Sequence, residues 1–125
     1  MKNLIIDAAN DKIIFSFITK NQSYTTSHIN SRENFDRFMN LLLFFLKENK
    51  IKLDDVDRIF VNKGPGKFSS LRISVSIAKA ISLVKNISLS GYDSRIVDSG
   101  NYKKLLELDK KNLKNNDLIK PLYSS

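Results

Sequence analysis

The sequence contains no cysteine and a single histidine, His28. The first absence excludes disulfides, thiol chemistry and cysteine-ligated zinc, and a lone histidine leaves little for any other transition-metal site. No run of about 18 apolar residues, the length that a membrane span needs, occurs in the chain. The apolar run before Asp7 is also too short for the core of a secretory signal. These absences predict a cytoplasmic protein with no metal, no cofactor and no membrane segment.

The chain has 125 residues, of which 42% are hydrophobic and 27% are charged. That length supports one domain with a single core, so a two-lobed enzyme is not expected. The net charge of +8 invites a nucleic-acid interpretation, because clustered Lys and Arg side chains release counterions from phosphate. Lysine far outnumbers arginine, however, a skew that an AT-rich genome produces without selection for binding, and most lysines are interpreted as solvated surface. One local cluster contains no acid: Lys63, Lys67, Arg72, Lys79 and Lys85.

Apolar, β-branched and aromatic runs predict five strands, at residues 3–7, 12–19, 22–28, 57–62 and 87–93. The first three form an antiparallel meander, and right-handed crossovers place the later two parallel to the first. One helix runs from Asn30 or Ser31 to about Asn49, and a second from Phe68 to Lys85. The fold class is therefore α/β with a mixed five-stranded sheet and two main helices. In the tail, a short helix around Leu105 and a Lys/Asn-rich linker precede "LIKPLYSS", which is expected to dock as an edge strand or extended segment.

Both main helices carry more apolar surface than one core uses. In the first, one stripe is assigned to the core, and Leu41 and Phe44 fall outside it beside Arg37; the stripe is Phe35, Phe38, Met39, Leu42, Phe45 and Leu46. In the second, the core stripe is Ile73, Ile77, Ala80, Ile81 and Val84, and a stripe of smaller residues lies nearly opposite: Leu71, Val75, Ala78 and Ser82. A helix with two apolar faces is either sandwiched inside the domain or part of an interface, and the pattern alone leaves both open.

The stretch "NKGPGKFSSLR", residues 62–72, joins a strand to the second helix. It is not a P-loop, because Val61 stands where that motif needs its first glycine and Phe68 follows Lys67 in place of Ser or Thr. Two interpretations remain. The turn presents free amides that bind an anion with help from Lys67 and Arg72, or its glycines only permit a sharp turn that Phe68 anchors to the core.

Asp7 ends the first strand, where actin-like ATPases and RNase H-like nucleases keep a metal-binding acid. Such a nuclease needs further carboxylates that converge on two metals, and Asp54, Asp55 and Asp57 lie at the opposite end of the sheet if the strands are parallel. The alternative for Asp7 is a turn-capping acid. His28 has no evident partner and is interpreted as a surface residue at a strand end.

The segment "GPGKFSSLRISVSIAKAIS" resembles the G-P-G-S-F-T-G-L-R-I-G signature of the TsaB (YeaZ) family, relatives of the Gcp/Kae glycoprotease-like proteins. The matching residues are Gly64, Pro65, Gly66, Phe68, Leu71, Arg72 and Ile73. The opening "LIIDAANDKIIFSFI" is similar to the family's first two strands, and "SRENFDRF" to the segment that opens its first helix. The final "IKPLYSS" is similar to the family's C-terminal P-x-Y-x-R.

The resemblance implies an actin-like, RNase H-type lobe over residues 1–98, with residues 99–125 as a reduced remnant of a second lobe. It also implies a non-catalytic subunit that binds the transferase TsaD and, with the ATPase TsaE, supports the synthesis of threonylcarbamoyladenosine in tRNA. In the family, the two helices pack against those of TsaD or of a second copy. The implied interface is Arg37, Leu41, Phe44, Leu71, Val75, Ala78 and Ser82, beside a signature loop of Gly64, Pro65, Gly66, Lys67, Phe68 and Arg72. Contact with tRNA is expected to be indirect or weak.

The sequence departs from the family pattern at several positions. Lys67 replaces a serine, Ser70 and Ser74 replace glycines, and Asn34 stands where the family often has histidine. Without most of the second lobe, a nucleotide cleft between lobes and independent ATP hydrolysis are not expected. Two rival functions are kept: an RNase H-like nuclease or resolvase that uses Asp7, and a tRNA-binding module that uses Lys63, Lys67, Arg72 and Lys79.

Overall fold

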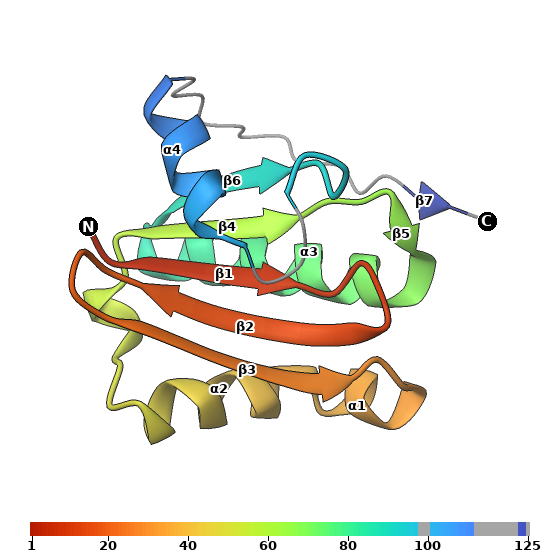
Figure 1. Ribbon diagram of the computed structural model, residues 1–125. Coiled ribbons are helices and arrows are strands. Elements are labelled where there is room, and N and C mark those ends of the chain that lie inside the picture. Colours follow the sequence, from red (N-terminus) through yellow and green to blue (C-terminus); the bar gives the residue numbers. More distant parts are fainter. Residues whose placement is uncertain (98–100, 112–122, 125) are drawn as a thin grey trace.

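A mixed five-stranded sheet forms the centre of the computed structural model, which describes residues 1–97, 101–111 and 123–124 (Figure 1). Its strands are β1 (Asn3–Asp7), β2 (Lys12–Ile18), β3 (Ser23–Ile29), β4 (Arg58–Asn62) and β6 (Ser88–Tyr92), in the spatial order β3-β2-β1-β4-β6. The first three strands form an antiparallel meander, and β4 and β6 continue the sheet in parallel with β1. The predicted α/β class and mixed sheet are confirmed.

Burial along the strands follows their place in the sheet. β1 is buried at every residue, as expected for a strand covered on both faces. β3 lies at the edge and alternates, with Tyr24, Thr26 and His28 half-buried and the residues between them exposed. His28 therefore packs at an edge strand, with its ring centroid 6.3 Å from that of Phe15.

The first predicted helix is broken into two. α1 (Arg32–Asp36) begins after Ser31, whose side chain accepts a hydrogen bond from the Asn34 amide, and α2 (Phe38–Glu48) follows. The break is at Arg37, where φ is −107° and ψ is 10°. The prediction of one continuous helix is wrong at this residue because the apolar spacing continues across a break in the backbone.

The second main helix, α3 (Phe68–Lys85), has the predicted bounds and ends at Asn86, which adopts the left-handed conformation. A short helical turn, η1 (Leu53–Asp55), precedes β4, and α4 (Lys103–Lys111) contains the predicted short helix. Two short strands, β5 (Gly66–Lys67) and β7 (Tyr123–Ser124), pair in parallel. β7 falls within the predicted C-terminal segment; residues 118–122 and 125 of that segment, and residues 112–117 of the predicted linker, lie outside the described residues.

The sheet separates two apolar cores. α1, α2 and α3 cover one face, and α4 covers part of the other (Figure 1). The larger core contains Phe15, Phe38, Leu42 and Ile59 among its buried residues. The smaller core lies under α4; its buried residues are Ile5, Ile18, Phe60, Tyr92, Val97, Tyr102 and Leu105.

The face of α3 that packs on the sheet is displaced from the predicted one. Leu71, Val75 and Ala78 are at most 2% exposed. In the predicted core stripe, Ile81 is buried and Ile73 and Ile77 are half-buried against the core. Ala80 is exposed, and Val84 is 81% exposed. The assignment fails because the buried side includes Ser70 and Ser74, which the hydrophobic pattern ignores and which have no exposed surface. Small residues let the helix lie close to the sheet.

A smaller correction applies to α2. Leu41 is only 7% exposed and belongs to the core, whereas Met39, which was assigned to the core, is 36% exposed. Phe44 is 59% exposed, and Arg37 is exposed just before the helix begins.

These burials predict the effects of two matched truncations in α3. Leu71→Ala should lower the free energy of unfolding by about 2–5 kcal/mol, because it leaves a cavity in a closed core. Val84→Ala should change it by less than about 0.5 kcal/mol, because the side chain is already in water. Urea denaturation followed by circular dichroism measures both. The reverse order of effects would restore the face assignment made from the sequence.

Candidate functional site

The loop between β4 and α3 is held by hydrogen bonds within the chain. The backbone amides of Lys63 and Lys67 each donate at 2.9 Å, to carbonyls of β6 and of the turn between β1 and β2. The Gly64 amide donates to the side-chain oxygen of Asn62 at 2.9 Å, and Pro65 has no amide hydrogen to offer. Three backbone amides that an anion site would use already donate hydrogen bonds within the chain. This favours the turn interpretation over the anion site.

Both glycines of the loop are required by its geometry. Gly64 has φ 98°, in the region that glycine adopts without strain. A β-carbon on Gly66 would lie 2.3 Å from the carbonyl oxygen of Ala9 and 2.7 Å from its β-carbon. The Ser94 hydroxyl closes the loop by donating to the Pro65 carbonyl at 2.6 Å. The signature motif therefore builds a tight junction between β4, β6 and the turn after β1.

The side chains that follow the glycines are exposed. The Lys67 amine pairs with the Asp11 carboxylate at 3.0 Å, an ion pair open to water and therefore worth little. Phe68 is 46% exposed, so the expectation that it anchors the turn in the core is wrong. The guanidinium of Arg72 instead lies over the Phe68 ring in a cation–π contact, with its central carbon 5.4 Å from the ring centroid. Lys67, which replaces the serine of the family signature, thus makes an ion pair within the chain.

The predicted basic cluster does not form one continuous patch. Lys67 pairs with Asp11, and Lys85, at the far end of α3, pairs with Asp54 at 3.1 Å. Arg72 and Lys79, seven residues apart, share one flank of α3 by helical spacing. Two of the five bases are therefore partly neutralised by acids of the same chain.

A buried hydrogen-bonded cluster surrounds Asp7 at the carboxyl end of β1. Asp7 is 2% exposed, and its Oδ2 accepts a hydrogen bond from the Tyr102 hydroxyl at 2.7 Å. Its Oδ1 accepts one from the Asn62 side-chain amide at 3.0 Å and a longer one from the Ala9 amide at 3.4 Å. The bond to Ala9 is that of a turn-capping acid, and the other two join β1 to β4 and to the start of α4.

Tyr92, at the end of β6, completes this cluster. Burial raises the pKa of its phenol well above the ordinary value, and the nearby Asp7 carboxylate raises the pKa further. The phenol therefore stays protonated at neutral pH. Its hydroxyl is buried without a well-aligned hydrogen bond.

Sequence reasoning identified Asp7 but missed Asn62, Tyr92 and Tyr102. The sequence did contain a signal for Asn62 and Tyr92. The neighbouring parallel strands β1, β4 and β6 each end in a residue with a polar group, and Asn62 is in register with Tyr92. Tyr102 follows β6 by ten residues and lies in no recognisable motif, so only the packing of α4 on the sheet brings it to Asp7.

The other acids lie away from Asp7, as predicted. The Asp57 carboxylate accepts a hydrogen bond from the Lys2 amide at 2.7 Å, at the opposite end of β1. Across the described ranges, no three His, Cys, Asp or Glu side chains gather as ligands of a metal ion. The arrangement gives the two-metal nuclease alternative no support.

The Asp7 cluster predicts a difference between two tyrosine variants. Tyr102→Phe leaves Asp7 Oδ2 buried without its donor and should lower the free energy of unfolding by about 1–3 kcal/mol. Tyr92→Phe removes a hydroxyl that makes no well-aligned hydrogen bond, so it should lower the free energy of unfolding clearly less than Tyr102→Phe does. Thermal and urea unfolding of both variants measure this, and equal losses would contradict the assignment of Tyr102 as the donor.

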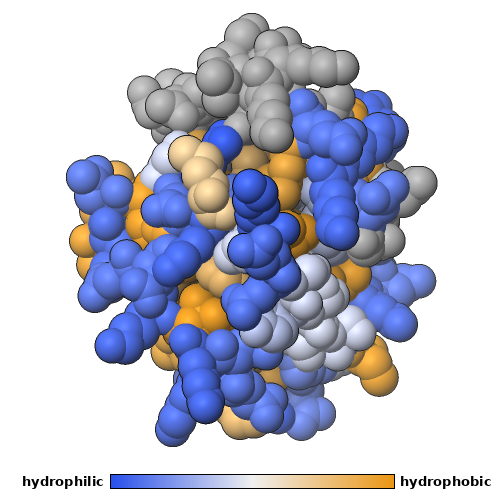
Figure 2. Space-filling model, turned by 60° about the vertical axis from the view of Figure 1, so that its left-hand side comes forward, coloured by the Kyte–Doolittle hydropathy of each residue, from blue (hydrophilic) through white to orange (hydrophobic). Residues whose placement is uncertain are grey.

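The helices leave apolar side chains on their outer surface. We call this set the outer apolar face: Met39 and Leu43 of α2, and Ile73, Ile77, Ala80 and Val84 of α3. Met39 and Leu43 are one turn apart on the flank of α2 nearer α3, and Ile73 and Ile77 are half-buried against the core that α2 also enters. Figure 2 shows one face of the molecule, on which hydrophilic residues cover much of the surface and smaller hydrophobic patches lie between them.

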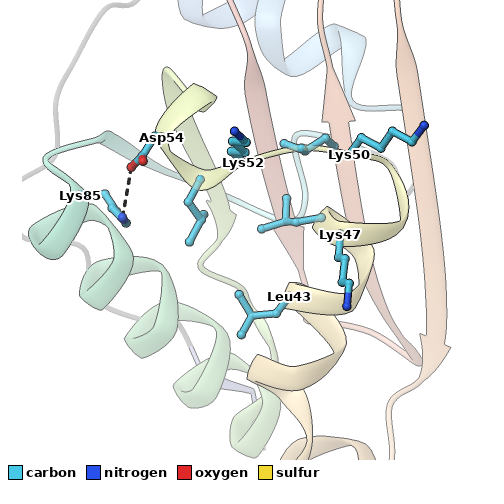
Figure 3. A pocket seen from close by; sticks show the side chains of 9 residues that line it. Leu43, Lys47, Lys50, Lys52, Asp54 and Lys85 are labelled. Carbon is cyan, nitrogen blue, oxygen red and sulfur yellow. Dashed lines mark ion pairs between the residues drawn. The ribbon is translucent and has the colours of Figure 1, made fainter.

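A groove lies where α2 and α3 end, and Leu43 points into it toward α3 (Figure 3). Its apolar lining is Leu43, Leu46, Ile51 and Leu53, and its charged lining is Lys47, Lys50, Lys52, Asp54 and Lys85. Because Leu43 belongs to both, the groove continues the outer apolar face.

The structure does not bring the seven predicted interface residues onto one surface. Leu41, Leu71, Val75 and Ala78 are buried in the chain's own core, so their assignment to an exposed face is wrong. Ser82 is half-buried, and its hydroxyl donates to the Ile87 carbonyl. Arg37 and Phe44 are exposed, but helical spacing places Phe44 on the flank of α2 opposite Leu43.

Sequence comparisons connect the chain to enzymes and proteins of one tRNA modification. The sequence model of the TsaD family, tRNA N6-adenosine threonylcarbamoyltransferase, matches residues 13–96. The tRNA threonylcarbamoyladenosine biosynthesis protein TsaB of Buchnera aphidicola subsp. Schizaphis graminum is 32% identical over 88 residues, covering 70% of this chain and 42% of that protein. The tRNA N6-adenosine threonylcarbamoyltransferase of Fusobacterium nucleatum subsp. nucleatum is 39% identical over 72 residues, covering 58% of this chain and 21% of that enzyme.

Solved structures show the same fold. YeaZ from Pseudomonas aeruginosa has a TM-score of 0.68 at 17% identity, over 74% of this chain and 43% of that one. RuvC from T. thermophilus, solved with a Holliday junction substrate, has a TM-score of 0.51 at 9% identity, over 79% and 71% of the two chains. Both likenesses support the predicted RNase H-like and actin-like lobe. The chain spans less than half the length of these curated relatives, and none of its described helices has the length and apolarity to cross a membrane.

Proposed function

We propose, from the premise that this chain belongs to the TsaD family and has TsaB (YeaZ) proteins among its relatives, a role in tRNA modification. The proposed role is that of a non-catalytic subunit in the synthesis of threonylcarbamoyladenosine in tRNA. In this role it binds a TsaD-like transferase in the cytoplasm and holds that enzyme in its active form. A TsaE-like ATPase is a further member of the complex, and contact with tRNA is indirect.

The observation that carries this proposal is the outer apolar face. Val84 is 81% exposed, Leu43 is 43% exposed, and Ala80, one turn before Val84, is also exposed. Apolar side chains that share one surface of a small domain are typical of an interface with another protein. The helices that carry them are the ones that the family resemblance assigns to partner binding, although the residues on the exposed side are different ones.

The Asp7 cluster supports the non-catalytic part of the proposal. Both carboxylate oxygens are buried and already accept hydrogen bonds from the chain's own groups. A carboxylate in these bonds stabilises the junction between β1, β4 and α4.

Co-purification with the cognate TsaD-like transferase tests the proposal. Val84→Asp and Ala80→Asp place a charge on the outer apolar face and should weaken the complex by about tenfold or more, as a buried charge at an interface centre does. Ile29→Asp is the matched control, since Ile29 is 73% exposed and ends the edge strand β3, which belongs to neither helix. Isothermal titration calorimetry gives the affinities. Absence of any complex with the unmodified chain, or equal effects of Ile29→Asp and Val84→Asp, would reject this interface.

Phe44→Asp is a separate arm of the same experiment. A loss of affinity with this variant would extend the interface to the flank of α2 that carries Arg37 and Phe44. An unchanged affinity would confine the interface to the flank shared with α3.

The role in tRNA modification has a test of its own. Depletion of the protein should lower the threonylcarbamoyladenosine content of tRNA, and mass analysis of tRNA nucleosides measures this. Re-expression of the Ile29→Asp variant should restore the modified adenosine, whereas Val84→Asp should not. A normal content after depletion would contradict the proposed function.

A further inference from the structure

The short strand β5 has a different neighbour at each of its two edges. The Lys67 amide donates to the Ala9 carbonyl at 2.9 Å, so one edge of β5 faces the turn between β1 and β2. β7 pairs with the other edge in parallel, with Gly66 beside Tyr123 and Lys67 beside Ser124. Figure 1 shows β7 next to β5 at the beginning of α3, apart from the five-stranded sheet. The outer edge of β5 therefore receives a strand from a segment far along the chain.

This outer edge presents backbone amides that need acceptors. In an extended segment the amides of successive residues point to opposite edges. Because the Lys67 amide points to Ala9, those of Gly66 and Phe68 point toward β7. Phe68 is the first residue of α3, so its amide is one of the four that find no acceptor within the helix. β7, which contacts α3 as well as β5, is placed to supply acceptors to both amides.

The side chains around the start of α3 do not take over this task. In the part of the chain that the structure describes, the Lys67 side chain does not cap α3, and the first turn of this helix has no acid. A serine, threonine or aspartate before a helix commonly accepts a hydrogen bond from its first amides. Here the main chain of an added strand takes the place of such a side chain.

Contacts that do not involve β7 hold β5 in position. A β-carbon on Gly66 would lie 2.3 Å from the carbonyl oxygen of Ala9, so the strand lies directly on that turn. The Ser94 hydroxyl donates to the Pro65 carbonyl at 2.6 Å, which fixes the residue before β5. A binding edge that is already ordered loses little conformational freedom when a segment binds to it. The edge is therefore preformed for an extended ligand.

The link between β7 and the rest of the fold is small. β7 pairs at two residues, and residues 112–122 separate it from α4. A two-stranded pair of this kind is marginal in water by itself. Connection through the same chain compensates for this, because a short flexible linker gives a tethered segment an effective concentration of about 1 mM or more. The pairing thus has the features of a weak binding equilibrium within one molecule.

We propose that the outer edge of β5 is a docking site for an extended peptide segment, and that the segment containing β7 is its built-in ligand. The site recognises the main chain of a parallel strand, whose carbonyls accept from the amides of Gly66 and Phe68. With β7 in place, the edge is closed to extended segments of other chains, for which an open edge is a template. The inference is independent of the proposed function, because no step of it involves the transferase.

A proline in β7 tests the pairing in the intact chain. Lys67 points away from β7, so the parallel register turns its neighbour Ser124 toward β5, and Ser124→Pro removes the amide hydrogen there. In this variant the amides of Gly66 and Phe68 should exchange with solvent about tenfold faster or more, as in a local opening. The Lys67 amide, bonded to Ala9, should keep its rate. Hydrogen exchange followed by NMR measures all three amides.

Ser124→Ala is the matched control, because it keeps the amide and should leave the three exchange rates unchanged. Unaltered rates in Ser124→Pro, or equal acceleration in the alanine variant, would reject the proposed role of the β7 main chain. A second measurement needs no variant. In the unmodified chain, the Gly66 and Phe68 amides should exchange through a local opening whose rate is insensitive to low urea concentrations. Exchange of both amides through global unfolding alone would overturn the inference.

Addition of the ligand as a separate molecule tests whether the site accepts it in trans. The probe is a synthetic peptide with the sequence of residues 117–125, DLIKPLYSS. At about 1 mM, comparable to the effective concentration of the tethered segment, it should shift the Gly66 and Phe68 resonances of the Ser124→Pro chain and slow their exchange. The same peptide with Ser124→Pro should do neither. The unmodified chain should respond more weakly, because its own segment occupies the edge.

The remaining outcomes contradict the proposal in different ways. A peptide that leaves the resonances of the Ser124→Pro chain unchanged would show that the edge is not a docking site. Equal responses of the unmodified chain and the variant, or shifts confined to other strands, would place the peptide elsewhere. Sedimentation of the unmodified chain should show a monomer. A dimer that Ser124→Pro dissociates would assign β7 to a second copy and overturn the claim that the chain's own segment is the ligand.

Discussion

The close contact of α3 with the sheet determines most of what the surface of this protein offers. The residues of α3 that meet the sheet include Ser70, Ser74 and Ala78, all without exposed surface. Both serine hydroxyls donate to carbonyls of the preceding turn, at 3.2 and 3.1 Å, so their burial leaves no unsatisfied donor. Because the helix approaches the sheet on this side, Ile73 and Ile77 stay half-buried and Val84 is exposed. The outer apolar face is therefore a consequence of how the core is packed.

A second constraint holds the carboxyl ends of the parallel strands together. Asp7 receives donors from Asn62 of β4 and from Tyr102 at the start of α4, and the Gly64 amide donates to the same Asn62. The signature loop is thus continuous with the buried polar cluster, and Gly66 presses against the turn that follows Asp7. In a low-dielectric interior, such hydrogen bonds between buried polar groups favour one arrangement of the strands. The carboxyl ends of β1 and β4 are thus joined to the start of α4 through Asp7.

The exposed apolar side chains lie on the helical side of the molecule. The outer side of α3 supplies Ala80 and Val84, with Ile73 and Ile77 half-buried, and α2 supplies Met39 and Leu43. Lysines line the groove where the two helices end. The proposed interface rests on these side chains.

The sequence by itself determined the order and type of the five sheet strands and of α3, because strand alternation, apolar runs and the strand-to-helix glycine turn are local signals. The break between α1 and α2 was not among them. It also carried the family resemblance through Gly64, Gly66 and their neighbours, whose backbone geometry the structure explains. Only the tertiary structure decided which side of α3 is buried. Hydrophobicity favours the stripe of Ile73 and Val84, whereas close packing on the sheet favours the small residues, and packing prevailed. The tertiary structure likewise brought Tyr102 to Asp7 across 95 residues of chain, a contact that no local pattern encodes.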